Sequence, residues 1–279
     1  HSHVFIDPSA DDDQRFKMWM FSSWWEGGPG ERLDEAEGMR RLNARNAAPK
    51  GVETEPVALK GAMLGLHSPD GLRWTQYDQP ILNEWHDTHN VAAWCPDRKK
   101  YVGYFRGFYA GRRAISYAET SDFSQWPGTS MLVQGLPFDE PDAQLYSNCY
   151  TRYPGVPQLH LMFPAIYHLG DDNVDGELAV SLDGRMWSRH ANKPIIRNGV
   201  PGELTAGHIY PEPNLLRMKQ HGELRLLLRA GTRYHNEWYN DKLRDSVPHR
   251  NNLAWAKWPE ERMGGIRADG EGQFTLQMQ

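Results

Sequence analysis

Several features that would place this 279-residue chain in a common class are missing from it. It has two cysteines, Cys95 and Cys149, which form neither a Cys-x-x-Cys pair nor a disulfide framework. No run of 18 apolar residues occurs, so we expect no membrane-spanning segment and no membrane partner. The first residues lack a charged-then-apolar signal pattern, although a processed export signal would leave no trace. The chain starts inside an expected strand, so we also expect residues to be missing at one or both ends.

Other absences concern ligands. The net charge is −5, with 31 basic and 36 acidic residues spread along the chain, so we expect no nucleic-acid partner. There is no glycine-rich phosphate loop, no nucleophile-elbow serine, and no His-x-His or His-Glu-x-x-His spacing. We therefore expect no cofactor and no metal among the site residues. A structural calcium ion is favoured over zinc if a water-filled axial channel holds a metal.

What the chain does contain is a repeated turn. Asp70 and Trp74, Asp122 and Trp126, and Asp183 and Trp187 each form an Asp-x-x-x-Trp motif. An Asp carboxylate can accept backbone N–H bonds in a tight turn, Gly tolerates positive φ there, and the Trp packs back as a wedge. The spacing between the copies is that of four-stranded propeller blades.

Short apolar segments between these turns read as strands. The expected strands lie in four successive units, at residues 4–10, 15–21 and 57–66; 91–94, 101–106 and 114–118; 145–150, 158–164 and 177–181; and 207–212, 223–229 and 251–256. Residues 22–56 interrupt the pattern and predict a loop and a short surface helix at 31–45, a rim or lid over a site. The sequence predicts a single all-β domain over residues 1–279, a β-propeller. Five blades are favoured, four being readable and the fifth incomplete or missing.

One stretch adds a family resemblance. Asp7-Pro8-Ser9-Ala10, with Phe16-Lys17-Met18 one strand later, resembles the first blade of the five-bladed propeller glycoside hydrolases of families 32, 43, 62 and 68. The similarity is greatest to uncharacterised bacterial family 32 and 43-like proteins. It implies a glycosidase of carbohydrate metabolism with a carbohydrate substrate, and favours a secreted or periplasmic bacterial location over the cytoplasm.

The resemblance also implies which carboxylates act. Asp7 falls on the first-blade position and is the expected nucleophile or base, with an Asp that only closes a turn before Pro8 as the alternative. Asp87, at the start of the next unit, is the expected second carboxylate, although Asn90 lies nearer the family position. A solvated loop Asp is the alternative for Asp87. Asn90 in that position would put classical hydrolase activity in doubt.

The third carboxylate would act as the general acid, and we choose Glu212 for this role. The alternative interpretation is that Glu212 is only an exposed loop residue. Glu203 flanks the same strand, and Asp139, Glu140 and Asp142 are further candidates before the third unit.

Residues expected to bind substrate are those whose rings or forked donors could line the funnel. They are Trp19, Asn90, Arg106, Tyr146 and His208, with Trp24, Arg112 and Arg113 as additional candidates and His86, His89 and His235 near the inner strands.

These residues favour a hydrolase of glycosidic bonds, with furanosides or side chains of plant or algal polysaccharides as substrates. One alternative is a non-catalytic propeller that binds glycans or a protein, in which the Asp residues only close turns. Another is a propeller glycoside phosphorylase, in which Arg and His residues would hold phosphate. Nothing in the sequence sets the sugar, the stereochemistry or the oligomeric state.

Overall fold

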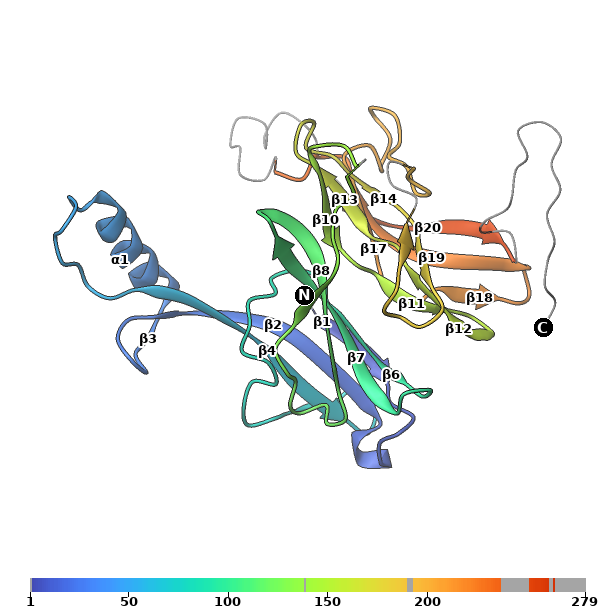
Figure 1. Cartoon of the computed structure of the whole chain (residues 1–279), viewed down its shortest axis with the longest axis horizontal. Coiled ribbons are helices and arrows are strands. Elements are labelled where there is room, and N and C mark those ends of the chain that lie inside the picture. The colour runs from blue at the N-terminus through green and yellow to red at the C-terminus, as the bar shows by residue number, and fades with distance from the viewer. Residues whose placement is uncertain (1, 138, 190–192, 237–250, 261–262, 264–279) are drawn as a thin grey trace.

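The computed structural model describes residues 2–137, 139–189, 193–236, 251–260 and 263 (Figure 1). Strands dominate these residues and form four successive antiparallel units, the four that the sequence predicts. Buried residues alternate along Glu223–Gly231, whereas Lys100–Tyr109 and Arg112–Thr120 carry unbroken buried runs, a pattern typical of strands covered on both faces.

The first unit pairs its strands in chain order. It contains β1 (Ser2–Ile6), β2 (Phe16–Glu26), β4 (Ala58–Ser68) and β5 (Thr75–Gln76), with a 3₁₀ turn at Asp12–Gln14 between β1 and β2. Residues 7–10, which we expected to extend the first strand, instead form the turn that leads out of β1, because Asp7 caps it with its side chain.

Residues 21–61 form an arm that leaves the first unit. Ser2 of β1 pairs with Met20, so β2 beyond that point pairs with β4 and with β3 (Arg32–Leu33). The helix α1 (Glu35–Ala47) follows, and Figure 1 shows it at the far end of the arm, away from the sheets. It begins where the Asp34 carboxylate accepts the Glu37 N–H at 2.8 Å, an N-cap later than the expected start at residue 31.

The second and third units repeat the four-stranded pattern. The second contains β6 (Val91–Cys95), β7 (Lys100–Tyr109), β8 (Arg112–Thr120) and β9 (Ser130–Val133). In the third, each of the first three strands is broken into two segments, namely β10 (Ala143–Ser147) and β11 (Tyr150–Tyr153), β12 (Val156–Met162) and β13 (Ala165–His168), and β14 (Val174–Gly176) and β15 (Ala179–Ser181), before β16 (Ser188–Arg189).

The fourth unit has three rows of strands in the part of the chain that the structure describes, because its first two segments lie end to end. Its segments are β17 (His208–Pro211), β18 (Leu216–Met218), β19 (Glu223–Gly231) and β20 (Asn251–Pro259). β17 and β18 both pair with β19, and a parallel bridge between Val174 and His208 joins β14 to β17.

The repeated turns have the predicted structure. Asp70 Oδ1 accepts the N–H groups of Leu72 and Arg73, and Asp183 Oδ1 accepts those of Arg185 and Met186, all at 2.8 Å. These backbone bonds lower the pKa of both carboxyls. Trp187 folds back to donate to the Gly184 carbonyl at 3.2 Å. The turns therefore close the units and belong to the scaffold.

The core lies between neighbouring sheets. Trp19, Phe105 and Trp126 pack between the first and second units. Tyr104 packs between the second and third units, and Leu224 packs between the third and fourth. Both cysteines are free and buried. Among the described residues, no helix is long and apolar enough to cross a membrane.

Candidate active site at the inner strands

Residues at the ends of the first strands contact neighbouring units. The backbone N–H of Ala92, on β6, donates to His3 Nδ1 on β1 at 3.4 Å. Asn148, after β10, donates to the Tyr104 carbonyl at 3.1 Å, and His89 Nδ1 lies 3.0 Å from Glu212 Oε2 after β17. Loops far apart in sequence therefore surround one place, which we call the inner-strand site.

This site is defined by a network of charged and aromatic side chains. Its members come from the second, third and fourth units and are Asp87, His89, Arg106, Arg113, Tyr146, Tyr167, Tyr210, Glu212, Arg229 and His235.

Tyr146 is the centre of the network. The guanidinium carbon of Arg106 lies 5.0 Å from its ring centroid and that of Arg113 lies 5.3 Å away. The rings of Tyr210 and His235 lie 5.8 Å and 4.7 Å from the same ring. Arginine above a tyrosine face is a favourable cation–π contact, so these stacked side chains hold each other in place.

The two carboxylates of the site each have a basic partner. Asp87 forms an ion pair with Arg106, whose side chain is 6% exposed while that of Asp87 is 37% exposed. Glu212 contacts His89 and lies 3.9 Å from Arg229 Nε, which in turn stacks over Tyr210. Asp87 is thus paired with a buried guanidinium while part of its side chain still reaches solvent.

Asn90 shapes the loop that carries Asp87. Its amide donates to the carbonyls of His86 at 2.9 Å and Thr88 at 2.8 Å, and its Oδ1 accepts the Arg106 N–H at 3.0 Å. The side chain is 3% exposed and its bonds are taken up within the protein. Of the two candidates for the second carboxylate position, Asp87 is therefore the one that presents a group to solvent.

The remaining predicted substrate-binding residues lie at different depths. His208 is buried below Tyr210, with its ring centroid 5.1 Å away and its Nδ1 2.7 Å from the Arg233 carbonyl. Trp19 lies in the core at 1% exposure and donates to the Asn90 carbonyl, so it supports the loop from below. Arg106 and Tyr146 are at the site itself.

Burial sets the protonation of the aromatic and imidazole groups. It raises the pKa of Tyr167 to about 12 and also raises that of Tyr210, while it lowers the pKa of His235 to about 4. His235 is therefore neutral at pH 7, and it shares a hydrogen bond with the Tyr210 hydroxyl.

Asp7 lies elsewhere. Its carboxylate accepts from Ser9 N at 3.0 Å, Ser9 Oγ at 2.6 Å and Tyr101 Oη at 2.6 Å. Tyr101 and Arg106 are five residues apart on β7, which is roughly 17 Å along a strand. The expected convergence of Asp7 with Asp87 therefore does not occur, because β1 runs away from the inner-strand site. The bonds of Asp7 are those of the turn-closing alternative.

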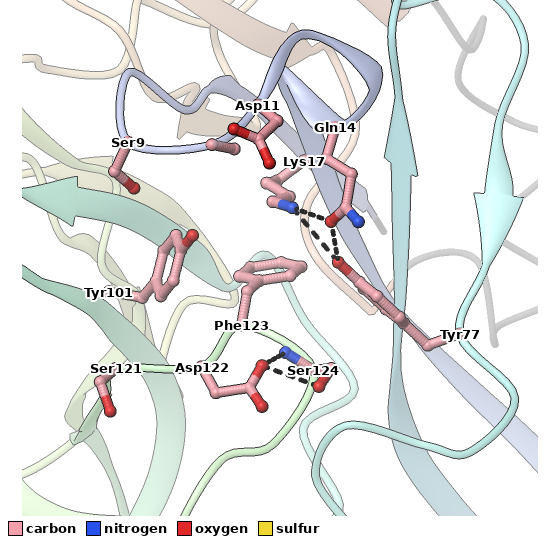
Figure 2. Close-up of a pocket in the computed structure, with 11 residues that line it drawn as sticks. Ser9, Asp11, Gln14, Lys17, Tyr77, Tyr101, Ser121, Asp122, Phe123 and Ser124 are labelled. Atoms are coloured by element: carbon pink, nitrogen blue, oxygen red, sulfur yellow. Dashed lines mark hydrogen bonds between the residues drawn. The ribbon is translucent and has the colours of Figure 1, made fainter.

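A pocket opens beside this turn. It has a volume of about 380 Å³ and is lined mainly by polar residues, among them Ser9, Asp11, Lys17 and Asp122, together with the Phe123 ring (Figure 2). Lys17 Nζ donates to Gln14 Oε1 at 2.7 Å, and burial lowers the pKa of this ammonium group. Figure 2 shows its nitrogen directed toward Gln14 and Tyr77, which also line the pocket.

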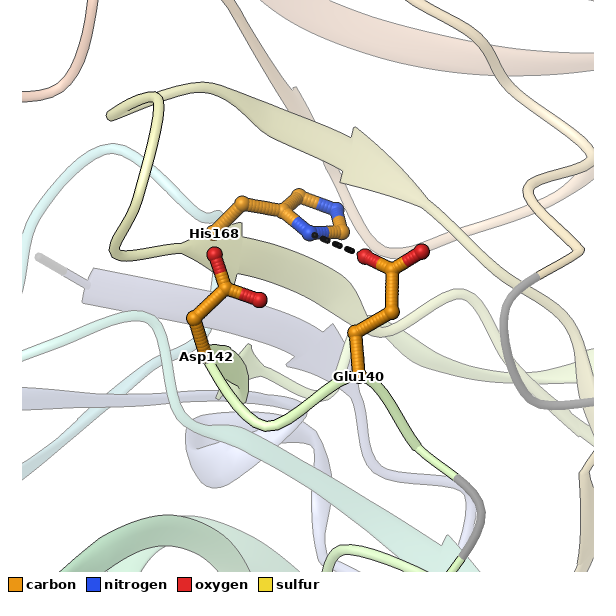
Figure 3. Close-up of side chains that lie close together, drawn as sticks. All are labelled: Glu140, Asp142 and His168. Carbon is orange, nitrogen blue, oxygen red and sulfur yellow. Dashed lines mark ion pairs between the residues drawn. The ribbon is translucent and has the colours of Figure 1, made fainter.

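The alternative carboxylates have other partners. Asp139 forms an ion pair with buried Arg189. Glu140 and Asp142 lie with His168 in a group whose ligand atoms are within 4.8 Å of one another (Figure 3). His168 contacts Glu140 through Nδ1 and Asp175 through Nε2, both at 3.4 Å, and the bond to Asp175 raises its pKa. Two carboxylates thus lie on opposite sides of the ring and favour its protonated form.

Sequence reasoning did not single out Tyr167, Tyr210 and Arg229. The signal that could have found them is alternation. Tyr210, on β17, and Glu212, just after it, lie two residues apart, and Arg229 is the partner of Tyr210 on β19.

Comparison with known proteins extends the description of the fold. No protein-family model and no curated protein matches the sequence. Among solved structures, the N-acetylgalactosamine deacetylase from F. plautii in complex with blood group B trisaccharide aligns with a TM-score of 0.56 and 11% identity. That alignment covers 94% of this chain and 90% of the other. The BT0996 protein, solved as an RGII complex, aligns with a TM-score of 0.50 and 11% identity, over 93% of this chain and 70% of that one.

Such likeness at low identity establishes the fold. Together with the successive four-stranded units, it confirms the predicted all-β propeller, whereas the fifth blade stays a prediction. The chain has the propeller fold that the resemblance to the five-bladed glycoside hydrolases implies.

Proposed function

We propose that the protein is a carbohydrate-active hydrolase that cleaves glycosidic bonds at the inner-strand site. The observation that supports this most is the pair of partly exposed carboxylates, Asp87 and Glu212, in one network of arginines and tyrosines. Glycoside hydrolysis needs one carboxylate that attacks or activates water and one carboxylic acid that protonates the leaving oxygen.

The partners of the two groups suggest their roles. Asp87, paired with Arg106, acts as the nucleophile or base. Glu212, whose nearest partner is the His89 ring at 3.0 Å, acts as the general acid and exchanges its proton with that ring. Tyr146 and Tyr210 offer aromatic faces and hydroxyl groups of the kind that sugar rings contact.

A second candidate is the removal of an acyl group from a sugar. The contact of His89 with Glu212 favours it, because a histidine oriented by a carboxylate is a common general base. The F. plautii protein, which is named as an N-acetylgalactosamine deacetylase, has the same fold.

One screen separates these functions. Wild-type protein is incubated with aryl glycosides, N-acetylated glycosides and plant and algal polysaccharides, and released reducing ends and acetate are measured separately. We expect reducing ends without acetate, independent of added phosphate. Acetate alone would support the second candidate, and cleavage only with phosphate would indicate a phosphorylase. Binding without either product would overturn the catalytic proposal.

A further inference from the structure

Two exposed aromatic residues stand two positions away from the members of the ion pair between Asp87 and Arg106. Trp85 precedes Asp87 by two residues and is 41% exposed. Phe108 follows Arg106 by two residues on β7 and is 60% exposed. Both rings therefore leave part of an aromatic face open to solvent.

Trp85 is fixed from behind by the arm. Its ring contacts Phe21 of β2 edge to face, with the ring centroids 5.0 Å apart. Gly61 of β4 makes room for both rings, because a Cβ there would lie 2.6 Å from Phe21 and 2.7 Å from Trp85. The arm thus packs against the residue two positions before Asp87, and it holds the Trp85 ring in place with part of its surface free.

Phe108 is fixed by the site itself. The Arg106 guanidinium carbon lies 5.6 Å from its ring centroid, and Arg113 is its direct partner on β8. Residues two apart on a strand share a face, so Phe108 lies on the same face as Arg106. Tyr109, which is 52% exposed, lies on the opposite face and provides a natural control.

We propose that the ligand of the inner-strand site is a sugar chain of several units, whose rings stack on Trp85 and Phe108 to either side of the Asp87 carboxylate. This inference rests on the proposed function and narrows its substrate class to oligosaccharides and polysaccharides. Sugar rings have apolar faces and polar edges, so one chain can satisfy both the exposed rings and the charged groups between them. The fixed position of both rings lowers the entropy lost on binding.

The test is affinity electrophoresis of the full chain in gels that contain arabinan, xylan, inulin or pectin. A Glu212→Gln background prevents cleavage during the run. Trp85→Ala and Phe108→Ala are compared with two exposed aromatic controls, Tyr109→Ala and Trp255→Ala, the latter on β20 at 44% exposure. Near-ultraviolet circular dichroism verifies that each variant is folded.

We expect at least one polysaccharide to retard the parent protein. Trp85→Ala and Phe108→Ala should each weaken that binding about tenfold, which corresponds to about 1.4 kcal/mol, while the controls bind as the parent does. Equal retardation of all variants, or none by any polysaccharide, would overturn the inference. Cleavage is scored independently on aryl monoglycosides. Activity there without polysaccharide binding leaves the proposed function intact, and binding without any cleavage leaves the inference intact.

Discussion

Asp87 and Asp7 are carboxylates of the same kind whose surroundings give them different roles. Asp87 is 37% exposed and has one charged partner, whereas Asp7 is 1% exposed and has its oxygens occupied by Ser9 and Tyr101. A catalytic carboxylate needs access to substrate, and a turn-closing one needs donors. The exposure and the partners of an aspartate therefore predict its role better than the residue type alone does.

Tyr101→Phe tests the structural role of Asp7. It leaves Asp7 Oδ2 buried without its hydroxyl donor, which we expect to lower the free energy of unfolding by about 1–3 kcal/mol. Urea unfolding at pH 7 measures the loss. Tyr109→Phe, at an exposed position of the same strand, should change it by less than about 0.5 kcal/mol. Equal stabilities of the two variants would contradict the assigned role of Asp7.

At the scale of elements, the repeated turns and the alternating strands were predictable. A strand with one buried face places apolar residues at every second position, and Asp followed by Gly encodes the turn that joins two such strands. Both signals are local. The position of Asp7 was not predictable, because the Asp-Pro motif identifies a turn without showing at which end of the inner strand that turn lies.

The turn glycines differ in what surrounds them. Gly71 and Gly184 both have positive φ, +75° and +69°, but a Cβ at Gly184 would lie 2.8 Å from the Tyr104 hydroxyl, whereas the nearest atom at Gly71 is 3.5 Å away. Both alanine substitutions carry backbone strain of about 1 kcal/mol. Gly184→Ala must also displace Tyr104, so we expect it to cost about 1–3 kcal/mol more.

Thermal and urea unfolding of the two glycine variants measure this difference. An equal loss in both would show that the packing of Tyr104 against the third turn contributes nothing.

At the scale of the whole molecule, the order of the units brings the inner-strand site together. Blade spacing in the sequence singled out Asp87, Arg106, Tyr146 and Glu212, which lie before β6, on β7, on β10 and just after β17. The aromatic partners and the arm beside Trp85 depend on contacts between units. Such contacts leave no periodic signal in one sequence.

Buried histidines make the stability of the whole fold depend on pH. Burial lowers the pKa of His3 to about 3 and of His160 to about 4, below the value of about 6.5 expected in the unfolded chain. Between these values the unfolded state binds more protons, so stability rises with pH and falls as the pH drops from 6.5 toward 4. Each group contributes up to about 1.4 kcal/mol per pH unit.

The variant His160→Gln should make this dependence shallower between pH 5 and 6.5, as measured by urea unfolding at several pH values. The Tyr150 hydroxyl loses its contact with the imidazole in this variant, which lowers the free energy of unfolding equally at all pH values. The slope of stability against pH therefore still reports on the titration of His160. An unchanged slope would mean that His160 is not held neutral in the folded protein.

The most direct measurement compares Asp87→Asn, Glu212→Gln and Asp7→Asn with wild-type protein on the substrate that the glycan screen identifies. The predicted result is that Asp87→Asn and Glu212→Gln each lower kcat/KM of the folded protein by at least about 100-fold. Asp7→Asn should lower the stability and leave kcat/KM of the folded protein within about threefold of wild type. Loss of activity in folded Asp7→Asn, with activity retained in Asp87→Asn, would contradict the inner-strand site as the place of catalysis.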